Sequence, residues 1–392
     1  MISLSPAMRG HAIRLVDLVK KHPSLIAIFG FVSGLASFFL VERKESLAQV
    51  IGLIMLAGWV WLLLENWLRV GILQRFGFEM PPAVMRFATQ LIHQESLFFT
   101  LPFFLAVTTW DHGQAGFTLL LVGCALVSLV DPIYYQWLAP RRSLFVAFHA
   151  LTLFAVLLVV IPLIFSLSTD ESLWWALGLA LLLSLPSLGG LLPNHQWWRV
   201  PVLLLMLTAM VAGTWMMRAW IPPAALRLTG ITLSQQMDRA QREPGESIDQ
   251  ISASRLHEEG LYAWTSVRAP RGLREKIHHV WLLDGKVADR IMLDIHGGRE
   301  DGYRAWTHKR NFPADSVGRW QVRVITDSGQ LVGLTRFRVI ESPPVGPDTL
   351  IKPLMVPDQD ESTPPEVIEL DLEAELVPDT KFELEPSMTS QP

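Results

Sequence analysis

Residues 198–240 read WRVPVLLLMLTAMVAGTWMMRAWIPPAALRLTGITLSQQMDRA, and the chain changes character inside this stretch, near Trp220. Leu-rich apolar runs fill almost everything before Trp220, and none follows it. Apolar runs of about 17 or more residues are long enough, as helices, to cross a hydrocarbon core about 30 Å thick. The sequence therefore predicts a membrane-bound first half and a water-soluble second half.

Working back from Trp220, about seven such runs can be placed, which predicts an α-helical transmembrane bundle over residues 25–220. The runs are Leu25–Val41, Leu47–Trp67, Ala88–Thr109, Ala115–Leu138, Ser143–Phe165, Leu173–Leu192 and Trp198–Trp220. The third run is the least regular, because its first turns carry polar and charged residues. Residues 1–24 are basic, and no small-residue cleavage site follows the first apolar run, so this segment is interpreted as a retained cytoplasmic anchor.

Lys and Arg gather in loops that the predicted bundle places on one side of the membrane. These residues are Arg9, Arg14, Lys20 and Lys21, then Arg69, Arg75 and Arg86, then Arg141 and Arg142, and finally Arg199. Such a bias marks the cytoplasmic side. With an odd number of spans, the C-terminal half then faces the periplasm of a bacterial inner membrane, and a count wrong by one span reverses this orientation.

Beyond Trp220, short β-rich runs separated by turn residues predict an antiparallel, all-β, immunoglobulin-like sandwich over residues 261–340. The expected strands are Leu226–Leu233, Leu261–Val267, Lys276–Leu283, Val287–Ile295, Tyr303–Lys309, Arg319–Thr326 and Leu331–Ile340. Asp284-Gly285 and Ser328-Gly329 are the expected hairpin turns. Residues 221–260 are interpreted as a linker with the first strand and a short helix, and the Pro- and acid-rich residues 341–392 as a disordered tail.

Four motifs in the C-terminal half carry a family resemblance. They are Ile277-His278-His279-Val280-Trp281, the strand from Arg304 to Lys309, Gly318-Arg319-Trp320-Gln321-Val322 and Phe337-Arg338-Val339. This H-x-W, R-x-W-x-x-K, G-x-W-x-V and F-x-V pattern resembles a small C-terminal domain of bacterial envelope proteins, a domain of unknown function. The resemblance covers roughly Leu261–Ile340, and the first half is similar to the multi-pass segments that accompany this domain. It implies a sandwich and no activity.

Aromatic and cationic residues on two of the expected strands form a candidate binding site. His279 and Trp281 alternate along one strand and share a face, as do Arg304, Trp306 and His308 on another, with Lys309 at its end. Aromatic surface beside cationic donors is a common way to hold a sugar or a carboxylate. The competing interpretation, which the sequence favours, is that Trp281, Trp306 and Trp320 fill the sandwich core and that His279 is a satisfied hydrogen-bond donor at an edge.

Ionisable residues in the apolar half form a second candidate site. Antiparallel threading brings Glu65, His93, Glu95, Asp131 and His149 to the cytoplasmic-side third of the membrane. Such groups are unfavourable in a bilayer unless they face a polar interior, so they suggest a proton or metal path. The competing interpretation, which the sequence favours slightly, is that they lie near the interface and snorkel to it, or pair with Arg141 and Arg142.

Signatures of catalysis and of cofactor binding are scarce in this sequence. No G-x-S-x-G, G-x-x-x-x-G-K, H-E-x-x-H or dinucleotide glycine motif occurs, and the single Cys124 excludes a thiolate metal cluster. We therefore expect no cofactor, no metal and no nucleic-acid partner. The leading hypothesis is a non-enzymatic binding or scaffold module that presents a periplasmic sandwich to an envelope protein or a cell-wall glycan. The alternative is a small transporter or ion-coupled membrane protein, and a membrane-embedded enzyme ranks third.

Overall fold

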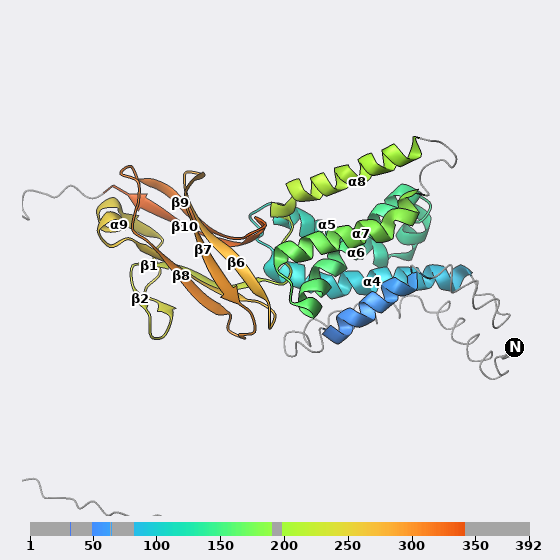
Figure 1. The fold of residues 1–392 in the computed structure, drawn as a ribbon, viewed down its shortest axis with the longest axis horizontal. Helices are drawn as coiled ribbons and strands as arrows, with labels where there is room; N and C mark the ends of the chain where they lie inside the picture. Colours follow the sequence, from blue (N-terminus) through green and yellow to red (C-terminus); the bar gives the residue numbers. More distant parts are fainter. Residues whose placement is uncertain (1–31, 33–48, 63, 65–81, 190–197, 342–392) are drawn as a thin grey trace, which may run out of the picture. The chain divides into compact units, whose positions relative to one another are not determined.

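The computed structural model describes residues 32, 49–62, 64, 82–189 and 198–341 (Figure 1). The basic N-terminus, most of the expected span Leu25–Val41, Glu65 and the acidic tail lie outside the described residues. Two parts are distinguished below. The helical part comprises the described residues from 49 to 220, and the β-part comprises residues 227–341.

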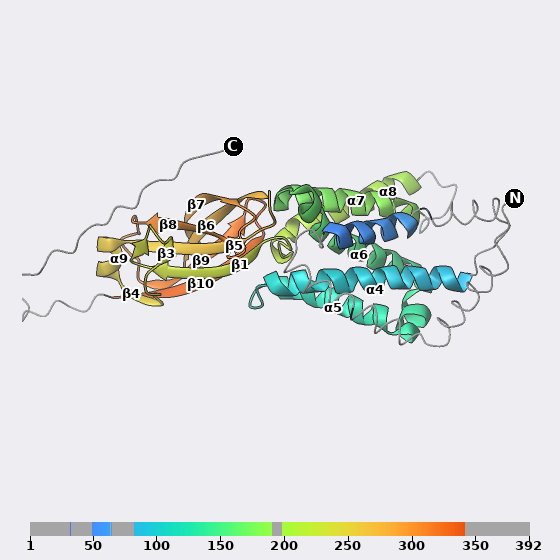
Figure 2. The ribbon, with the colours of Figure 1, turned by 90° about the horizontal axis from the view of Figure 1, so that it is seen from below.

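Helices of very different lengths make up the helical part. An unlabelled helix spans Gln49–Leu62. The others are α4 (Pro82–Val107), α5 (Gln114–Leu129), the π-helix η1 (Ile133–Leu138), α6 (Arg142–Phe165), α7 (Thr169–Gly189), α8 (Arg199–Met216) and the short 3-10 helix η2 (Arg218–Trp220). Figure 2 shows α4 running beside α5, with α6 between α4 and α7.

The prediction of a bundle of about seven membrane spans was wrong. Within the residues that the structure describes, only α6 is long and apolar enough to cross a membrane, and most of the apolar window in α6 is buried. The expected span Ala115–Leu138 is interrupted, because α5 ends at Leu129 and a π-helix follows Pro132, which cannot donate a backbone hydrogen bond. Gln90, His93, Gln94 and Glu95 likewise interrupt the apolar run of α4.

A single apolar cluster forms the core of the helical part. Fifteen residues of α6 are buried, and they pack against α4, α5 and α7. The side chains that pack around α6 with almost no exposed surface include Phe99 and Phe104 of α4, Leu121 of α5 and Leu173 of α7. A helix apolar on all sides is expected at the centre of such a bundle, and α6 occupies that position.

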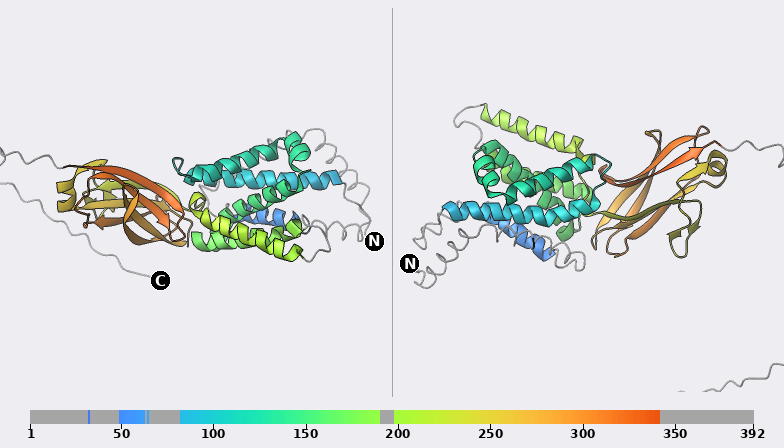
Figure 3. Two further views of the ribbon diagram at one scale, coloured as in Figure 1. Left: turned by 90° about the horizontal axis from the view of Figure 1, so that it is seen from above. Right: turned by 180° about the vertical axis from the view of Figure 1, so that it is seen from behind.

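Two larger sheets, packed face to face, form most of the β-part, as the views in Figure 3 show. The first has three antiparallel strands in the order β1-β5-β8, and the second has five in the order β4-β10-β9-β6-β7. Their bounds are β1 Arg227–Ser234, β4 Gln250–Ser252, β5 Leu261–Arg268, β6 Arg274–Leu283, β7 Lys286–His296, β8 Tyr303–Lys309, β9 Gly318–Thr326 and β10 Leu331–Ile340. The predicted β-rich C-terminal part is confirmed, and each of the seven expected strands is present within two residues of its expected ends.

Turn chemistry explains the hairpins that join these strands. Asp284 and Gly285 both have positive φ, at 46° and 83°, as the tight turn between β6 and β7 requires. Gly329 has φ 88° in the turn between β9 and β10. The segment before β5 holds the expected short helix, α9 (Ala253–Glu259), and also a small hairpin of β2 (Met237–Asp238) and β3 (Glu243–Pro244).

The core of the β-part lies between the two sheets. Trp281 of β6, Trp320 of β9 and Phe337 of β10 pack together there, facing Leu261 and Ala263 of β5. The rings of Trp320 and Phe337 are stacked with their centroids 5.8 Å apart. Burial of three such aromatic side chains is the largest apolar contribution to the stability of this domain.

Side-chain to backbone hydrogen bonds join the helical part to one end of the β-part. Gln114 Nε2 donates to Leu331 O at 2.7 Å, and Gln330 Nε2 donates to Ile221 O at 3.0 Å. Thr169 N, at the start of α7, donates to Glu275 Oε2 at 2.6 Å. Glu275 is buried, and burial raises its pKa to about 7. The described residues of both parts therefore belong to one compact unit.

Candidate functional site

The structure does not bring the five candidate binding residues of the β-part together. His279 and Trp281 point between the sheets and are fully buried. Along β8, Arg304 and Trp306 alternate with the buried residues Ala305, Thr307 and Lys309, so they point to the opposite, outer face. The candidate site is therefore divided between the interior and the surface of the domain.

His279 and Lys309 have their hydrogen-bonding needs met inside the domain. His279 Nε2 lies 3.1 Å from Thr265 Oγ1, and His279 Nδ1 lies 2.9 Å from Thr307 Oγ1. Burial lowers the pKa of His279 to about 4, so the ring is neutral near pH 7. Lys309 Nζ donates to Asp289 Oδ2 at 2.6 Å, which lowers the pKa of that carboxyl. The competing interpretation was right that His279 has its hydrogen bonds satisfied, but His279 lies in the core and not at an edge, and Trp306 lies on the outer face and not in the core.

The outer face of the three-stranded sheet carries four half-buried rings, which we call the aromatic row: Tyr262, Trp264, Trp306 and His308. The register places Tyr262 opposite His308 and Trp264 opposite Trp306. The Tyr262 and His308 rings are stacked at 3.9 Å, tilted by only 8°. Gly230 of β1 leaves room for the Trp264 ring, because a Cβ there would lie 2.8 Å from it.

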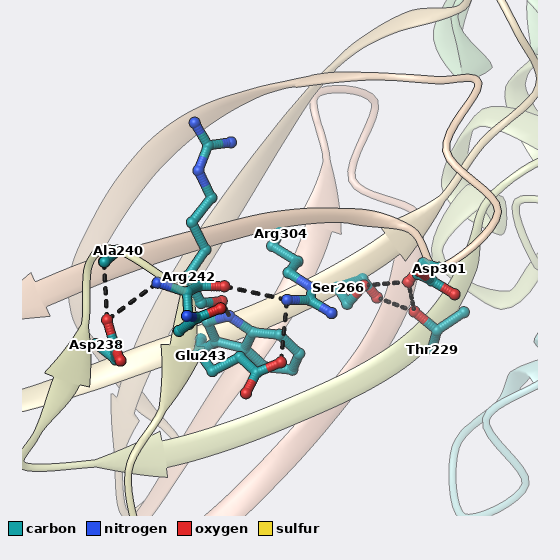
Figure 4. Close-up of polar contacts among 10 residues, drawn as sticks. Thr229, Asp238, Ala240, Arg242, Glu243, Ser266, Asp301 and Arg304 are labelled. Carbon is teal, nitrogen blue, oxygen red and sulfur yellow. Dashed lines mark hydrogen bonds and ion pairs between the residues drawn. The ribbon is translucent and has the colours of Figure 1, made fainter. Parts of the chain in front are cut away.

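Polar groups border the aromatic row where the β2–β3 hairpin crosses it (Figure 4). Arg304 Nη1 donates to Glu243 Oε1 and to Gln241 O, both at 3.1 Å, and Trp264 Nε1 donates to Arg242 O at 3.0 Å. The Arg304 side chain is 32% exposed and that of Glu243 is 59% exposed. Figure 4 shows the Arg242 side chain extending away from this group of contacts. Charged donors and acceptors thus adjoin aromatic surface at a solvent-accessible edge.

In the helical part, the structure does bring His93 and His149 together. His93 Nε2 lies 2.9 Å from His149 Nδ1, and His93 Nδ1 lies 2.8 Å from the Tyr134 hydroxyl. Trp59, Phe145 and Phe148 surround the pair, with ring centroids 5.2 to 5.8 Å from that of His93. The His93 side chain has no exposed surface. These three hydrogen-bonding side chains form a buried chain inside an aromatic enclosure.

The other members of the second candidate site lie apart from this chain. Asp131 Oδ1 accepts a hydrogen bond from Gln90 Nε2 at 2.7 Å, one turn of α4 before His93. Glu95 is half-buried on α4, two residues from His93 and on a different face of the helix. Glu65 lies outside the described residues. Over the ranges that the structure covers, no group of three or more His, Cys, Asp or Glu side chains could hold a metal ion.

Sequence reasoning missed several residues of both sites. Tyr262 and Trp264 alternate along β5 and pair with β8, so an antiparallel pairing of these two strands would have found the aromatic row. Tyr134 had no comparable signal, because the π-helix that carries it sets its direction.

Comparisons with known proteins give family relationships and no activity. Residues 274–339 match the model of a protein of unknown function (DUF2914), in agreement with the expected uncharacterised C-terminal domain. No curated protein and no solved structure matches the chain. Residues 6–263, more than half of the 392 residues, match the model of a family of unknown function (DUF5924). The chain therefore belongs to the DUF5924 family.

Proposed function

We propose that this protein is a membrane-bound, non-enzymatic binding protein whose β-part holds a glycan on the aromatic row. The observation that carries the proposal is the set of four half-buried rings on one outer face, beside the Arg304–Glu243 ion pair. Apolar faces of sugars pack on aromatic rings, and sugar hydroxyls hydrogen-bond to charged side chains. The two kinds of group adjoin in this arrangement.

A glycan fits the aromatic row better than a protein partner does. The row has four rings and a charged border formed by the β2–β3 hairpin, far fewer residues than the roughly 20–30 a side of a stable protein interface. A sugar chain needs only a few stacked residues and a few hydrogen bonds.

Attachment to a lipid bilayer is the second part of the proposal, and it rests on the surface of the helical part. Large apolar side chains on α5 and α8 are more than half exposed, among them Leu119, Leu126, Leu204 and Leu205. Exposed tryptophans lie near both ends of these helices: Trp110 and Trp220 near one end and Trp137 near the other. An apolar surface between two tryptophan levels is typical of a segment in contact with lipid.

The third part of the proposal is location and orientation. The protein lies in the inner membrane of a bacterium, with its N-terminus in the cytoplasm and its β-part in the periplasm. The Lys and Arg residues that precede α6, the one helix of the described residues long and apolar enough to cross a membrane, support this orientation. A periplasmic β-part would also meet cell-wall glycan, the ligand that its aromatic row is proposed to bind.

Co-sedimentation with purified peptidoglycan tests the glycan part of the proposal. The full-length protein in detergent is mixed with insoluble peptidoglycan, and the bound fraction is compared for wild type, Trp306→Ala and Arg304→Ala. We expect both variants to lose most of the binding while melting at the wild-type temperature. Met292→Ala, which changes an exposed side chain on the other sheet, is the matched control and should bind as wild type does. Equal binding by all four proteins, or none by the wild type, would contradict the proposal.

A further inference from the structure

The buried chain of Tyr134, His93 and His149 lies in the helical part and has no role in glycan binding. Three different elements supply its members: η1 supplies Tyr134, α4 supplies His93 and α6 supplies His149. Both nitrogens of His93 are engaged, at 2.8 Å and 2.9 Å. Any buried histidine needs both ring nitrogens hydrogen-bonded, but the partners of His279 are two threonines, whereas both partners of His93 are titratable side chains.

The surroundings of this chain keep water away from Tyr134 and His93 and leave His149 half-buried. His93 and Tyr134 are buried at 0% and 2% exposure, whereas His149 and Asp131 are half-buried. Asp131 lies three residues before Tyr134, and Tyr135 packs its ring against Tyr134 at 5.3 Å. Trp59 packs against His149, with the two ring centroids 4.8 Å apart, and its Nε1 donates to Ser96 Oγ at 2.9 Å.

The π-helix η1 is what aims Tyr134 at His93. Ala139 N donates to Tyr134 O at 2.9 Å, five residues back, as a π-helix requires. A π-helical turn is less stable than an α-helical one and is frequent at functional sites, where it directs a side chain. Here it places a phenol in the core of the helical part, where leucine or phenylalanine would pack without a polar atom to satisfy.

We propose that Tyr134, His93 and His149 form a proton-transfer chain in the helical part, with buried Tyr134 at one end and half-buried His149 at the other. Hydrogen-bonded ionisable side chains inside an apolar helical domain are the usual means of moving a proton there. The proposal is independent of the aromatic row, but it rests on the proposed bilayer position of the helical part.

The transfer balances without any co-reactant. At the start, Tyr134 donates its O–H to His93 Nδ1, and His93 donates its Nε2–H to His149 Nδ1. A proton that arrives at the Tyr134 oxygen displaces the phenol proton to His93 Nδ1. His93 then passes its Nε2 proton to His149 Nδ1, and His149 releases a proton from its own Nε2. One proton enters and one leaves. The Tyr134 hydroxyl and the His93 and His149 rings must then rotate to restore the first arrangement before a second proton can follow in the same direction.

Proton flux into vesicles tests the chain. The full-length protein is reconstituted into phosphatidylethanolamine–phosphatidylglycerol vesicles, incorporation is checked by flotation, and an internal pH-sensitive dye reports acidification under an imposed potential. We expect flux above that of protein-free vesicles, and its loss in His93→Gln and His149→Gln, because an amide keeps a donor and an acceptor but cannot relay a proton. His112→Gln, in the loop before α5, is the control and should conduct as wild type does.

Circular dichroism checks that each variant folds. If a histidine variant does not fold, Tyr134→Phe, which removes only the hydroxyl, tests whether the chain carries the proton flux. Flux that persists in well-folded Tyr134→Phe or His93→Gln overturns the chain. A wild-type protein that floats with the vesicles but conducts no protons overturns it too and leaves the bilayer proposal standing. A protein that does not float overturns both, since a proton path needs a membrane between its ends.

Discussion

The helical part and the β-part differ in how much of their large apolar side chains is exposed to solvent. In the β-part, such side chains lie between the sheets, and only Val287, Met292, Val317 and Ile340 are largely exposed over residues 227–341. In the helical part, exposed Leu, Val, Met and Trp side chains recur on the described helices, up to 80% exposure at Met216. Each such side chain gains about 1.5–3 kcal/mol when it leaves water. The β-part therefore buries most of its large apolar side chains, and the helical part leaves many exposed, as the proposed contact with lipid requires.

Removing an aromatic side chain from the β-part should have the largest effect. Trp281→Ala should destabilise the β-part by about 3–5 kcal/mol, because Trp281 is fully buried and its loss leaves a cavity. Denaturant unfolding followed by near-ultraviolet circular dichroism measures this. Trp306→Ala, at a half-buried position on the outer face, should change stability by less than about 1 kcal/mol. If the two variants are equally destabilised, the assignment of inner and outer faces is wrong.

Introducing a charge on the exposed surface of each part compares them directly. Leu205→Asp on α8 should make the free energy of membrane insertion less favourable by about 3 kcal/mol, the insertion cost of an aspartate within a bilayer, and so reduce the membrane-bound fraction. Met292→Asp on β7 should cost under about 0.5 kcal/mol, because its side chain is 53% exposed to water. The membrane-bound fraction in cells, measured by immunoblot, follows the effect of Leu205→Asp on insertion, and thermal melting measures the effect of Met292→Asp on stability. Normal membrane incorporation of Leu205→Asp would contradict a lipid-facing α8.

The pH dependence of Glu275 probes the junction between the parts. Its folded-state pKa of about 7 lies above the ordinary value of 4.5, so the folded protein binds this proton more tightly than the unfolded chain does. The stability contributed by protonated Glu275 is complete below about pH 4.5 and is lost as the pH rises to about 7. Glu275→Gln keeps an acceptor for Thr169 N and should be more stable than wild type at pH 8, by roughly 2 kcal/mol. Melting curves at pH 5 and pH 8 measure the difference, and an equal pH dependence in both proteins would remove Glu275 as its cause.

The exposed ion pair at the same junction should have the smallest effect. Arg336 Nη2 lies 2.6 Å from Asp111 Oδ2, and both side chains are more than half exposed. Arg336→Ala should cost under about 1 kcal/mol, and the cost should shrink as salt is added. Melting at low and high ionic strength checks this. A larger cost that salt does not reduce would mean that Arg336 contributes by packing, through its aliphatic stem.

Strand patterns predicted the β-part well, whereas apolar run length overestimated the number of membrane spans. Alternation and turn residues such as Asp284-Gly285 mark both ends of a strand. A long apolar run marks neither end of a helix, so Ala115–Leu138 concealed the break at Pro132 and the π-helix after it. The interpretation that the tryptophans fill the core was right for Trp281 and Trp320 and wrong for Trp306, because both faces of β6 are buried whereas β8 buries only one.

The contrast between a lipid-facing helical part and a water-facing β-part is tested most directly by the collision accessibility of a spin label at one exposed position in each part. Leu205→Cys and Met292→Cys are prepared in a Cys124→Ala background, labelled with a nitroxide and reconstituted into vesicles. Leu205 is 69% exposed and Met292 is 53% exposed, so neither label must displace packed neighbours. The account predicts that oxygen, which concentrates in lipid, relaxes the label at 205, and that a water-soluble nickel chelate relaxes the label at 292. Equal relaxation of both labels by the nickel chelate would contradict it.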